Sequence, residues 1–295
     1  MMKIGFIGLG MMGNPMAHLL AQTGHTLAVM DLNAATAARF AAEHAGASVA
    51  GELKDFGDAD IVITMLPDSN AVEAVVLGNA GKPGLLSILK KGATLIDMSS
   101  AEPMRSRKLA QTLQDKGLQY LDAPVSGGVK RAVDGTLAIM VGGDAAVLAQ
   151  CEPVLKTLGK NVTHVGQHGA GHAMKALNNY VSAAGLVATV EALQVGQSFG
   201  LDPEIMVAIL NSSTGKNNTT ENKAKQFMLS GAYNSGFSLA LMAKDLGIAM
   251  GLGESVGFDM PLGDEVLQIW RDANEALGKG ADHTEMYRYF RNRKQ

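Results

Sequence analysis

Residues 3–15 read KIGFIGLGMMGNP, and this stretch decides the fold of the first half of the chain. A strand pattern runs into Gly8, Gly10 and Gly13, and a helical pattern follows directly. Glycines at this spacing are a weak signal on their own, because the chain is rich in glycine. A second strand pattern then ends at Asp31. Strand, glycine turn, helix, strand and acidic residue in this order predict a dinucleotide-binding βαβ unit.

The glycines of this turn have separate physical roles. Gly8 permits a tight turn, Gly10 lets the backbone approach a pyrophosphate, and Gly13 lets the helix pack on the strand. The alternative is an ordinary βα turn whose glycines only serve packing. Asp31 would accept hydrogen bonds from the adenosine ribose and repel a 2′-phosphate, which favours NAD over NADP. The predicted cofactor-binding residues here are Gly8, Leu9, Gly10, Met11, Met12, Gly13 and Asp31.

The chain changes character near residue 165. Before it, strand patterns alternate with amphipathic helical patterns, which predicts a mostly parallel sheet covered by helices on both faces. After it, helical periodicity takes over, beginning with a long helix over residues 170–199. We predict an α/β Rossmann domain over residues 1–164 and an all-helical domain over residues 165–295, joined by this helix. The other predicted strands cover residues 61–65, 94–97, 119–123, 137–141 and 161–164. The other predicted helices cover residues 33–43, 103–116, 145–158, 203–210, 219–229, 239–253 and 261–277.

Composition excludes several classes of protein. The 295 residues include 25 basic and 28 acidic side chains, and this near-balance excludes a nucleic-acid binder driven by bulk charge. With 47% hydrophobic and 18% charged residues, the chain can bury a large core. Its uncharged run over residues 176–190 is shorter than the roughly 20 apolar residues of a membrane span. Cys151 is the only cysteine, so we expect no internal disulfide and a cytoplasmic location.

Three later strand patterns end in residues that suit ligand binding, because ligands of parallel sheets bind at the carboxyl ends of the strands. Leu66-Pro67 turns the backbone across the end of the third strand. Ser100 follows the fourth and can contact a nicotinamide ribose, or else cap the helix that starts near residue 103. Ser126-Gly127-Gly128 follows the fifth, where successive N–H groups can bind a carboxylate or simply form a flexible turn.

The long helical pattern contains a single lysine, Lys175, and no other charge over residues 169–190. The remaining residues are mainly apolar, so we expect this helix to be buried on nearly all sides. Lys175, Asn178, Asn179 and Ser182 recur at steps of three or four and form one polar stripe. A buried lysine without a carboxylate nearby in sequence favours its neutral form, as a catalytic base requires. A structural lysine that extends to the surface is the alternative.

With these motifs the chain resembles the β-hydroxyacid dehydrogenase family, which includes 3-hydroxyisobutyrate dehydrogenase and tartronate semialdehyde reductase. The resemblance covers essentially the whole chain and is carried by residues 6–17, 122–128, 171–179 and 244–246. It implies a Rossmann domain, a helical domain and an active site in the cleft. It also implies that Lys175 is the catalytic lysine.

The resemblance assigns further site residues. It implies that residues 126–128 and Asn179 hold the substrate, and that Ser100 and Lys244 touch the cofactor or the substrate. Phe237 falls where the family has an aromatic residue near the nicotinamide. On the sequence alone, Lys244 is equally well interpreted as a surface lysine beside Asp245.

Together, the motifs predict an NAD-dependent dehydrogenase or reductase of a small β-hydroxy acid resembling 3-hydroxyisobutyrate. Hydride passes to or from nicotinamide while Lys175 acts as general acid or base. Tartronate semialdehyde (2-hydroxy-3-oxopropionate) reductase is the alternative, although the polar residues 211–218 are closer to the 3-hydroxyisobutyrate type. A phosphogluconate-type decarboxylase is less consistent with the short chain, and a non-catalytic dinucleotide-binding protein is less consistent with Lys175.

The expected partners follow from the same features. His164, His168 and His172 lie at four-residue spacing, but no carboxylate or cysteine completes a ligand set, so we predict no metal site. We expect a small carboxylate substrate and no nucleic acid or membrane. The apolar faces of the helical half favour a homodimer or homotetramer.

Overall fold

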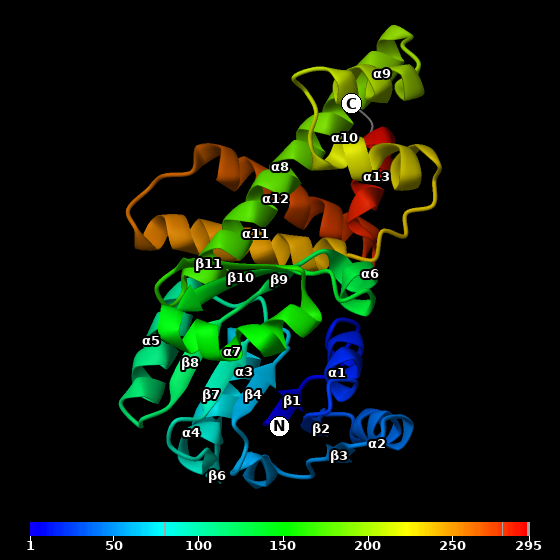
Figure 1. Ribbon diagram of the computed structural model, residues 1–295. Coiled ribbons are helices and arrows are strands. Elements are labelled where there is room, and N and C mark those ends of the chain that lie inside the picture. Colours follow the sequence, from blue (N-terminus) through cyan, green and yellow to red (C-terminus); the bar gives the residue numbers. More distant parts are fainter. Residues whose placement is uncertain (80, 279, 294–295) are drawn as a thin grey trace. The chain divides into compact units, whose positions relative to one another are not determined.

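A computed structural model describes residues 1–79, 81–278 and 280–293, and it consists of two compact units (Figure 1). The first unit is Met1–Lys175 and the second is Ala176–Gln295. Helix α8 (Ala170–Phe199) begins in the first unit and continues into the second. We describe each unit by itself.

The first unit contains a nine-stranded sheet with the order β11-β10-β8-β7-β4-β1-β2-β3 along its main path. The six strands from β3 to β8 along this path are parallel, and their order is that of a Rossmann fold, with the switch point between β1 and β4. Strand β10 is antiparallel to β8 and β9, and β11 is parallel to β10. The strands are β1 (Lys3–Ile7), β2 (Thr26–Met30), β3 (Ala47–Val49), β4 (Ile61–Thr64), β7 (Thr94–Asp97), β8 (Gln119–Asp122), β9 (Val125–Ser126), β10 (Ala138–Gly143) and β11 (Asn161–Gly166).

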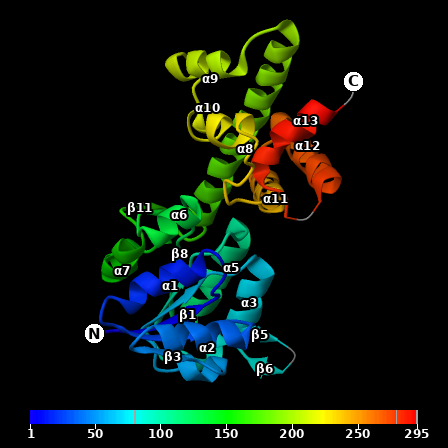
Figure 2. The same ribbon diagram turned by 90° about the vertical axis from the view of Figure 1, so that its right-hand side faces the viewer.

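Helices cover both faces of this sheet, and Figure 2 shows α1 and α2 on the side opposite to α3 and α5. Alternate residues of each strand enter two separate cores: Phe6 packs with α1 and α2, whereas Ile7 packs with α3. The helices are α1 (Gly13–Ala21), α2 (Ala34–Glu43), η1 (Leu53–Phe56), α3 (Ser69–Leu77), α4 (Leu85–Ile88), α5 (Pro103–Gln114), α6 (Gly128–Val133) and α7 (Ala145–Leu158), and a small separate sheet pairs β5 (Gly78–Asn79) with β6 (Lys82–Pro83).

The regular elements of the second unit over residues 176–278 and 280–293 are helices, and one isolated β-bridge joins Ser238 to Asp282. Its core surrounds Trp270, which is fully buried among residues of α8, α11 and α12. The elements after α8 are α9 (Pro203–Ser212), α10 (Asn218–Asn222), a π-helical turn η2 (Ala224–Leu229), α11 (Leu239–Ser255), α12 (Pro261–Leu277), η3 (His283–Glu285) and α13 (Met286–Asn292). The predicted fold class, a Rossmann unit followed by a helical unit, is confirmed.

Two predicted features differ in the structure. The single helix predicted over residues 219–229 is broken at Lys223, whose backbone leaves the helical region at φ −131° and ψ −44°. The expectation that α8 is buried on nearly all sides is wrong, because Val181, Val195 and Phe199 are 68%, 70% and 84% exposed. Hydrophobic composition shows that a helix has apolar faces, but it does not show which of them is covered within the chain. Among the described residues, no helix is both long and apolar enough to cross a membrane.

Candidate active site

The glycine turn after β1 has the geometry that a dinucleotide needs. Gly8 has a φ of 101°, and a Cβ atom there would lie 2.3 Å from the Met65 carbonyl oxygen. A Cβ atom on Gly13 would lie 1.9 Å from the Gly8 carbonyl oxygen, so only glycine lets α1 start this close to the strand. Gly10 faces open space, with nothing within 4 Å of where its Cβ would be. These residues therefore fit a pyrophosphate at the start of α1.

Asp31 is placed by the same turn. One of its carboxylate oxygens accepts the backbone N–H of Leu9 at 2.7 Å, and the other accepts the N–H of Asn33 at 2.8 Å. The carboxylate is thus fixed at the end of β2, beside the glycine turn. Each carboxylate oxygen has further lone pairs, which can accept ribose hydroxyl groups.

The ends of β4 and β7 are tied together by a buried serine. Ser99 accepts the backbone N–H of Leu66 at 2.9 Å, and its own N–H donates to Asp97. Neither Ser99 nor Ser100 caps α5, whose N-cap residue is Glu102. Among the predicted cofactor residues of this region, Leu66 and Ser100 are half-buried and Pro67 is exposed.

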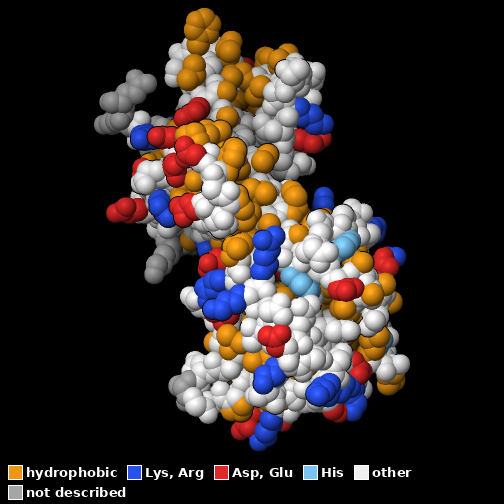
Figure 3. Space-filling view, turned by 90° about the vertical axis from the view of Figure 1, so that its left-hand side faces the viewer, with side chains coloured by type: hydrophobic (Ala, Val, Ile, Leu, Met, Phe, Trp, Pro, Cys, Tyr) orange, Lys and Arg blue, Asp and Glu red, His pale blue; other side chains and the backbone are white. Residues whose placement is uncertain are grey.

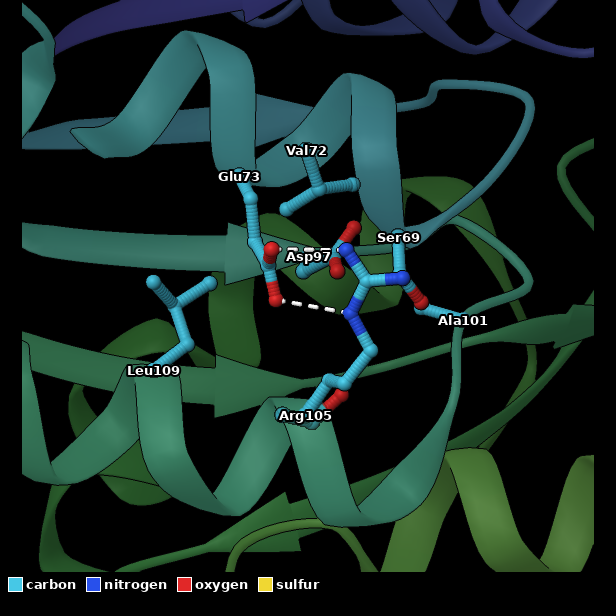
Figure 4. A pocket seen from close by; sticks show the side chains of 8 residues that line it. Ser69, Val72, Glu73, Asp97, Ala101, Arg105 and Leu109 are labelled. Carbon is cyan, nitrogen blue, oxygen red and sulfur yellow. Dashed lines mark hydrogen bonds and ion pairs between the residues drawn. The ribbon is translucent and has the colours of Figure 1, made fainter. Parts of the chain in front are cut away.

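A small hollow lies between α3 and α5, and Figure 4 shows that Arg105 closes it. The Arg105 guanidinium donates to both carboxylate oxygens of Glu73, at 2.8 and 2.6 Å. This pair lowers the pKa of Glu73 and raises that of Arg105. Ser69 in turn accepts the backbone N–H of Glu102 at 2.8 Å. The Arg105–Glu73 ion pair therefore occupies the hollow and holds α3 and α5 together beside the strand ends.

Ser126-Gly127-Gly128 forms a tight turn between β9 and α6. Both glycines are left-handed, with φ values of 136° and 68°, and both are exposed. Successive backbone N–H groups in a turn can bind an anion. Gly128 faces open space, since nothing lies within 4 Å of where its Cβ would be.

The first turn of α8 is anchored by Asp122 and His172, neither of which was predicted as a site residue. The fully buried Asp122 carboxylate accepts the N–H of Gly169 at 2.7 Å and the N–H of His172 at 3.0 Å. A negative charge at this end of a helix is favourable. The ring of His172 lies 2.7 Å from the Ser106 hydroxyl through Nδ1, and its Nε2 is 3.2 Å from the Ser99 carbonyl oxygen. Because a carbonyl only accepts, Nε2–H is the donor in that bond.

Close packing adds to this anchor. A Cβ atom on Gly171 would lie 2.4 Å from the carbonyl oxygen of Met140 and 2.5 Å from that of Asp122. Only glycine therefore allows the helix to pack this closely on β8 and β10. Lys175, one turn further along α8, is half-buried. The anchored turn fixes the backbone from which this lysine extends.

In the second unit, Asn179 is held by a buried acidic residue. Its amide Nδ2 donates to Asp245 Oδ2 at 2.6 Å, and Asn179 and Asp245 are only 6% and 2% exposed. Asp245 Oδ1 also lies 3.4 Å from the amine of Lys244. The side chain of Lys244 is 29% exposed. In the sequence, Asp245 is distinguished only by its position after Lys244, so its contact with Asn179 could not be predicted.

Phe237 belongs to a different cluster of the second unit. Its ring makes an edge-to-face contact with His283, with ring centroids 5.7 Å apart. Its carbonyl oxygen accepts the backbone N–H of His283 at 2.9 Å. These contacts fix the loop that precedes α11, and the ring of Phe237 itself is only partly buried.

Comparison with known proteins finds two family models that match this chain, one for each part of it. The family model described as the NAD binding domain of 6-phosphogluconate dehydrogenase matches residues 3–166. The model described as NAD-binding of NADP-dependent 3-hydroxyisobutyrate dehydrogenase matches residues 169–290.

Similar curated proteins include the 2-(hydroxymethyl)glutarate dehydrogenase of Eubacterium barkeri, which is 40% identical over 95% of this chain and 91% of its own length. The mitochondrial 3-hydroxyisobutyrate dehydrogenase of Bos taurus is 40% identical over 91% of this chain and 80% of its own. Among solved structures, a 3-hydroxyisobutyrate dehydrogenase of Mycobacterium tuberculosis with L-serine has a TM-score of 0.91 and 32% identity, and the match covers 99% of each chain. The chain therefore belongs to the β-hydroxyacid dehydrogenase family, oxidoreductases that act on a CH–OH group, with NAD as cofactor.

Proposed function

We propose that the substrate is a small β-hydroxy acid resembling 3-hydroxyisobutyrate and that Lys175 is the general acid or base. The observation that carries this proposal is the buried Asn179–Asp245 pair, one helical turn beyond Lys175 on α8. Because the carboxylate of Asp245 fixes the amide of Asn179, this amide can hold the substrate hydroxyl in one position beside Lys175. Rigid support of this kind is typical of a site that must align one proton with one carbon.

Each residue has a distinct task in this mechanism. The substrate carboxylate would bind to Ser126, Gly127 and Gly128. The dinucleotide would be held by Gly8, Leu9, Gly10, Met11, Met12, Gly13, Asp31, Leu66, Pro67, Ser100, Phe237 and Lys244. Bound NAD supplies the hydride acceptor. During oxidation, the neutral amine of Lys175 takes the proton of the substrate hydroxyl. During reduction, its ammonium returns a proton to the carbonyl oxygen. Asn179 orients that oxygen in both directions.

Two alternatives differ in chemistry. A tartronate semialdehyde reductase would use the same residues on a substrate with a hydroxyl in place of the methyl group. A dinucleotide-binding protein without turnover would have no use for Lys175 on an anchored helix turn. Rates of NAD reduction and NADH oxidation with a panel of small β-hydroxy acids and their aldehydes separate these possibilities.

Replacement of Lys175 by alanine tests the mechanism directly. General acid–base catalysis contributes roughly 10² to 10⁴ in rate, so Lys175→Ala should lower kcat by at least about a hundredfold. NADH binding, followed by fluorescence titration, should stay within about twofold, because the glycine turn is intact. The exposed Lys116 provides a matched control, since Lys116→Ala should affect neither quantity. Turnover of Lys175→Ala at the wild-type rate would rule out the assigned role.

We further propose that the chain acts in the cytoplasm as a homodimer or homotetramer. The side chains that support self-association are exposed apolar residues of α8 and α9 in the second unit, namely Val181, Val195, Phe199, Ile205 and Ile209. A surface of this kind is typical of interfaces between subunits. The buried Cys151 is free, as in a reducing compartment.

A further inference from the structure

His172 is a buried residue of α8 that has no role in the proposed mechanism. It lies about one helical turn before Lys175, and it is only 1% exposed. Both residues belong to the first unit, Met1–Lys175. An imidazole ring buried this deeply needs a hydrogen-bond partner for each of its two nitrogens. These partners show what the ring connects.

The ring of His172 bridges α5 and the end of β7. Its Nδ1 lies 2.7 Å from the Ser106 hydroxyl of α5, and its Nε2–H donates to the carbonyl oxygen of Ser99, which follows β7, at 3.2 Å. Asp97 Oδ2 lies 3.9 Å from Nε2, so the carboxylate charge favours the tautomer with the proton on this nitrogen. The Nδ1 lone pair then accepts the hydroxyl proton of Ser106.

The bond to Ser99 reaches a proposed cofactor residue. The Ser99 carbonyl and the Ser100 N–H belong to one peptide group, which is planar, so the bond from His172 orients both of its ends. Ser99 is also held from the other side. Its hydroxyl accepts the N–H of Leu66 at 2.9 Å, and its own N–H donates to Asp97 at 3.1 Å. The Ser99–Ser100 peptide is therefore fixed to both the strand ends and α8.

The backbone of His172 is fixed as well, because its N–H donates to the buried Asp122 carboxylate at 3.0 Å. Lys175 follows three residues later, about 4.5 Å along the helix axis. We propose that His172 is a positioning residue, which holds the Ser99–Ser100 peptide at a set distance from the helix turn of Lys175. It would thereby align the nicotinamide ring with the amine that transfers the proton. The proposal rests on the proposed function, in which Ser100 contacts the cofactor.

Asparagine and glutamine at position 172 separate the two ring contacts. The amide of asparagine takes the place of Nδ1, whereas the amide of glutamine reaches the place of Nε2 and can donate to Ser99. His172→Gln should therefore keep kcat within about threefold of wild type. His172→Asn should lower kcat by about tenfold to a hundredfold, because a displacement of about 1 Å at a reacting group has an effect of this size. The substrate is the β-hydroxy acid of the panel with the highest kcat/KM, at saturating NAD.

Ser106→Ala is the matched control, because it removes the other hydrogen bond of the same ring. It should lower the midpoint of thermal unfolding about as much as His172→Asn while keeping kcat within about threefold. NADH affinity should change by less than about threefold in every variant, since the glycine turn and Asp31 are intact. His164→Gln is a second control. Its Nε2 also lies near a backbone carbonyl, that of Gly143 at 2.8 Å, and its kcat should equal that of wild type.

A measurement on the wild-type protein does not depend on the folding of the asparagine variant. The ring nitrogens of isotopically labelled His172 can be observed by NMR and assigned by their loss in His172→Gln. Saturation with NADH should shift the Nε2 resonance more than the Nδ1 resonance, because only Nε2 contacts the peptide group that would adjoin the cofactor.

The outcomes separate this proposal from the proposed function. Wild-type kcat in His172→Asn would overturn the positioning role, and so would an Nε2 resonance that NADH leaves unshifted. Equal losses of kcat in His172→Asn and Ser106→Ala would show a merely structural histidine. In each of these cases Lys175→Ala would still be slow, so the proposed function would stand. Wild-type turnover of Lys175→Ala, or no turnover of any β-hydroxy acid, would instead overturn the proposed function.

Discussion

The Asp31 carboxylate combines two tasks at one position. It fixes the glycine turn through the N–H of Leu9, and it presents a negative charge where an adenosine ribose would lie. The first task needs only an oxygen atom, whereas discrimination against a 2′-phosphate needs the charge. The two tasks can therefore be separated by substitution.

Asp31→Asn should narrow the preference for NAD over NADP by about tenfold or more, because it keeps an oxygen for Leu9 and removes the repulsive charge. Asp31→Ser should narrow it as well, with an added loss of affinity for both cofactors. The measurement is the ratio of kcat/KM for NAD and NADP. Asp115→Ser, at an exposed position in the first unit, is the control. An unchanged ratio in both Asp31 variants would remove this residue from cofactor selection.

At the level of single residues, roles that depend on neighbouring residues could be predicted from the sequence, whereas contacts between distant positions could not. Gly8 and Gly13 could be interpreted from sequence because their turn is formed by neighbouring residues. Asp122 contacts Gly169 and His172 from 47 and 50 residues away, and no sequence pattern links such positions. His172 illustrates the same point: its bonds to Ser99 and Ser106 depend on how the strands and α5 are ordered.

At the level of elements, α8 was predicted with the correct ends, because its periodicity is long and unbroken. Helix α6 was missed, and η2 was predicted only as part of a longer helix over residues 219–229. Such segments are too short to be stable alone and form only where tertiary contacts hold them. Helix α6 begins at Gly128, which is one of the proposed substrate-binding residues.

We expect the contact between η3 and the loop before α11 to make the helical unit less stable in acid. Burial is the main reason that the pKa of His283 falls to about 4, and the nearby charge of Lys223 adds to the effect. The ring Nδ1 lies 2.9 Å from the Phe237 carbonyl oxygen, while Nε2 is buried without a hydrogen-bond partner among the described residues. A proton on Nε2 would therefore be poorly stabilised in the folded state.

The sign of the pH dependence follows from this depressed pKa. Between pH 6.5 and 4 the unfolded chain binds a proton that the folded chain does not, so stability falls as the pH is lowered through this range. The loss should be roughly 2 to 3 kcal/mol. Urea unfolding of wild type and His283→Gln at several pH values measures it. Asp282 also loses favourable contacts in acid, so the difference between the two proteins, rather than either slope, isolates His283.

His18, which is exposed on α1, provides a control for that experiment. His18→Gln should follow the wild-type pH dependence. The same pH dependence in His283→Gln and wild type would mean that His283 is protonated equally easily in the folded and unfolded states.

At the scale of the whole molecule, the exposed apolar face of the helical unit is the main feature that the fold of one chain does not explain. Figure 3 shows apolar side chains gathered on the helical unit on this side of the molecule. Phe199 is 84% exposed and Val195 is 70% exposed, four residues before it on the same face of α8. Leaving such residues in water is unfavourable, and a stable interface between two copies covers about 1,200 to 2,000 Å².

The combined change Val195→Lys and Phe199→Lys should therefore convert the proposed oligomer to a monomer, because two like charges would be buried at each copy of the interface. Sedimentation equilibrium measures the mass, and circular dichroism checks that the helices are retained. Leu77→Lys, an equally polar change at an exposed residue of α3 in the first unit, should leave the mass unaltered. A wild-type protein that sediments as a monomer at micromolar concentration would refute self-association. An oligomer that survives the double change would place the interface elsewhere, away from the end of α8.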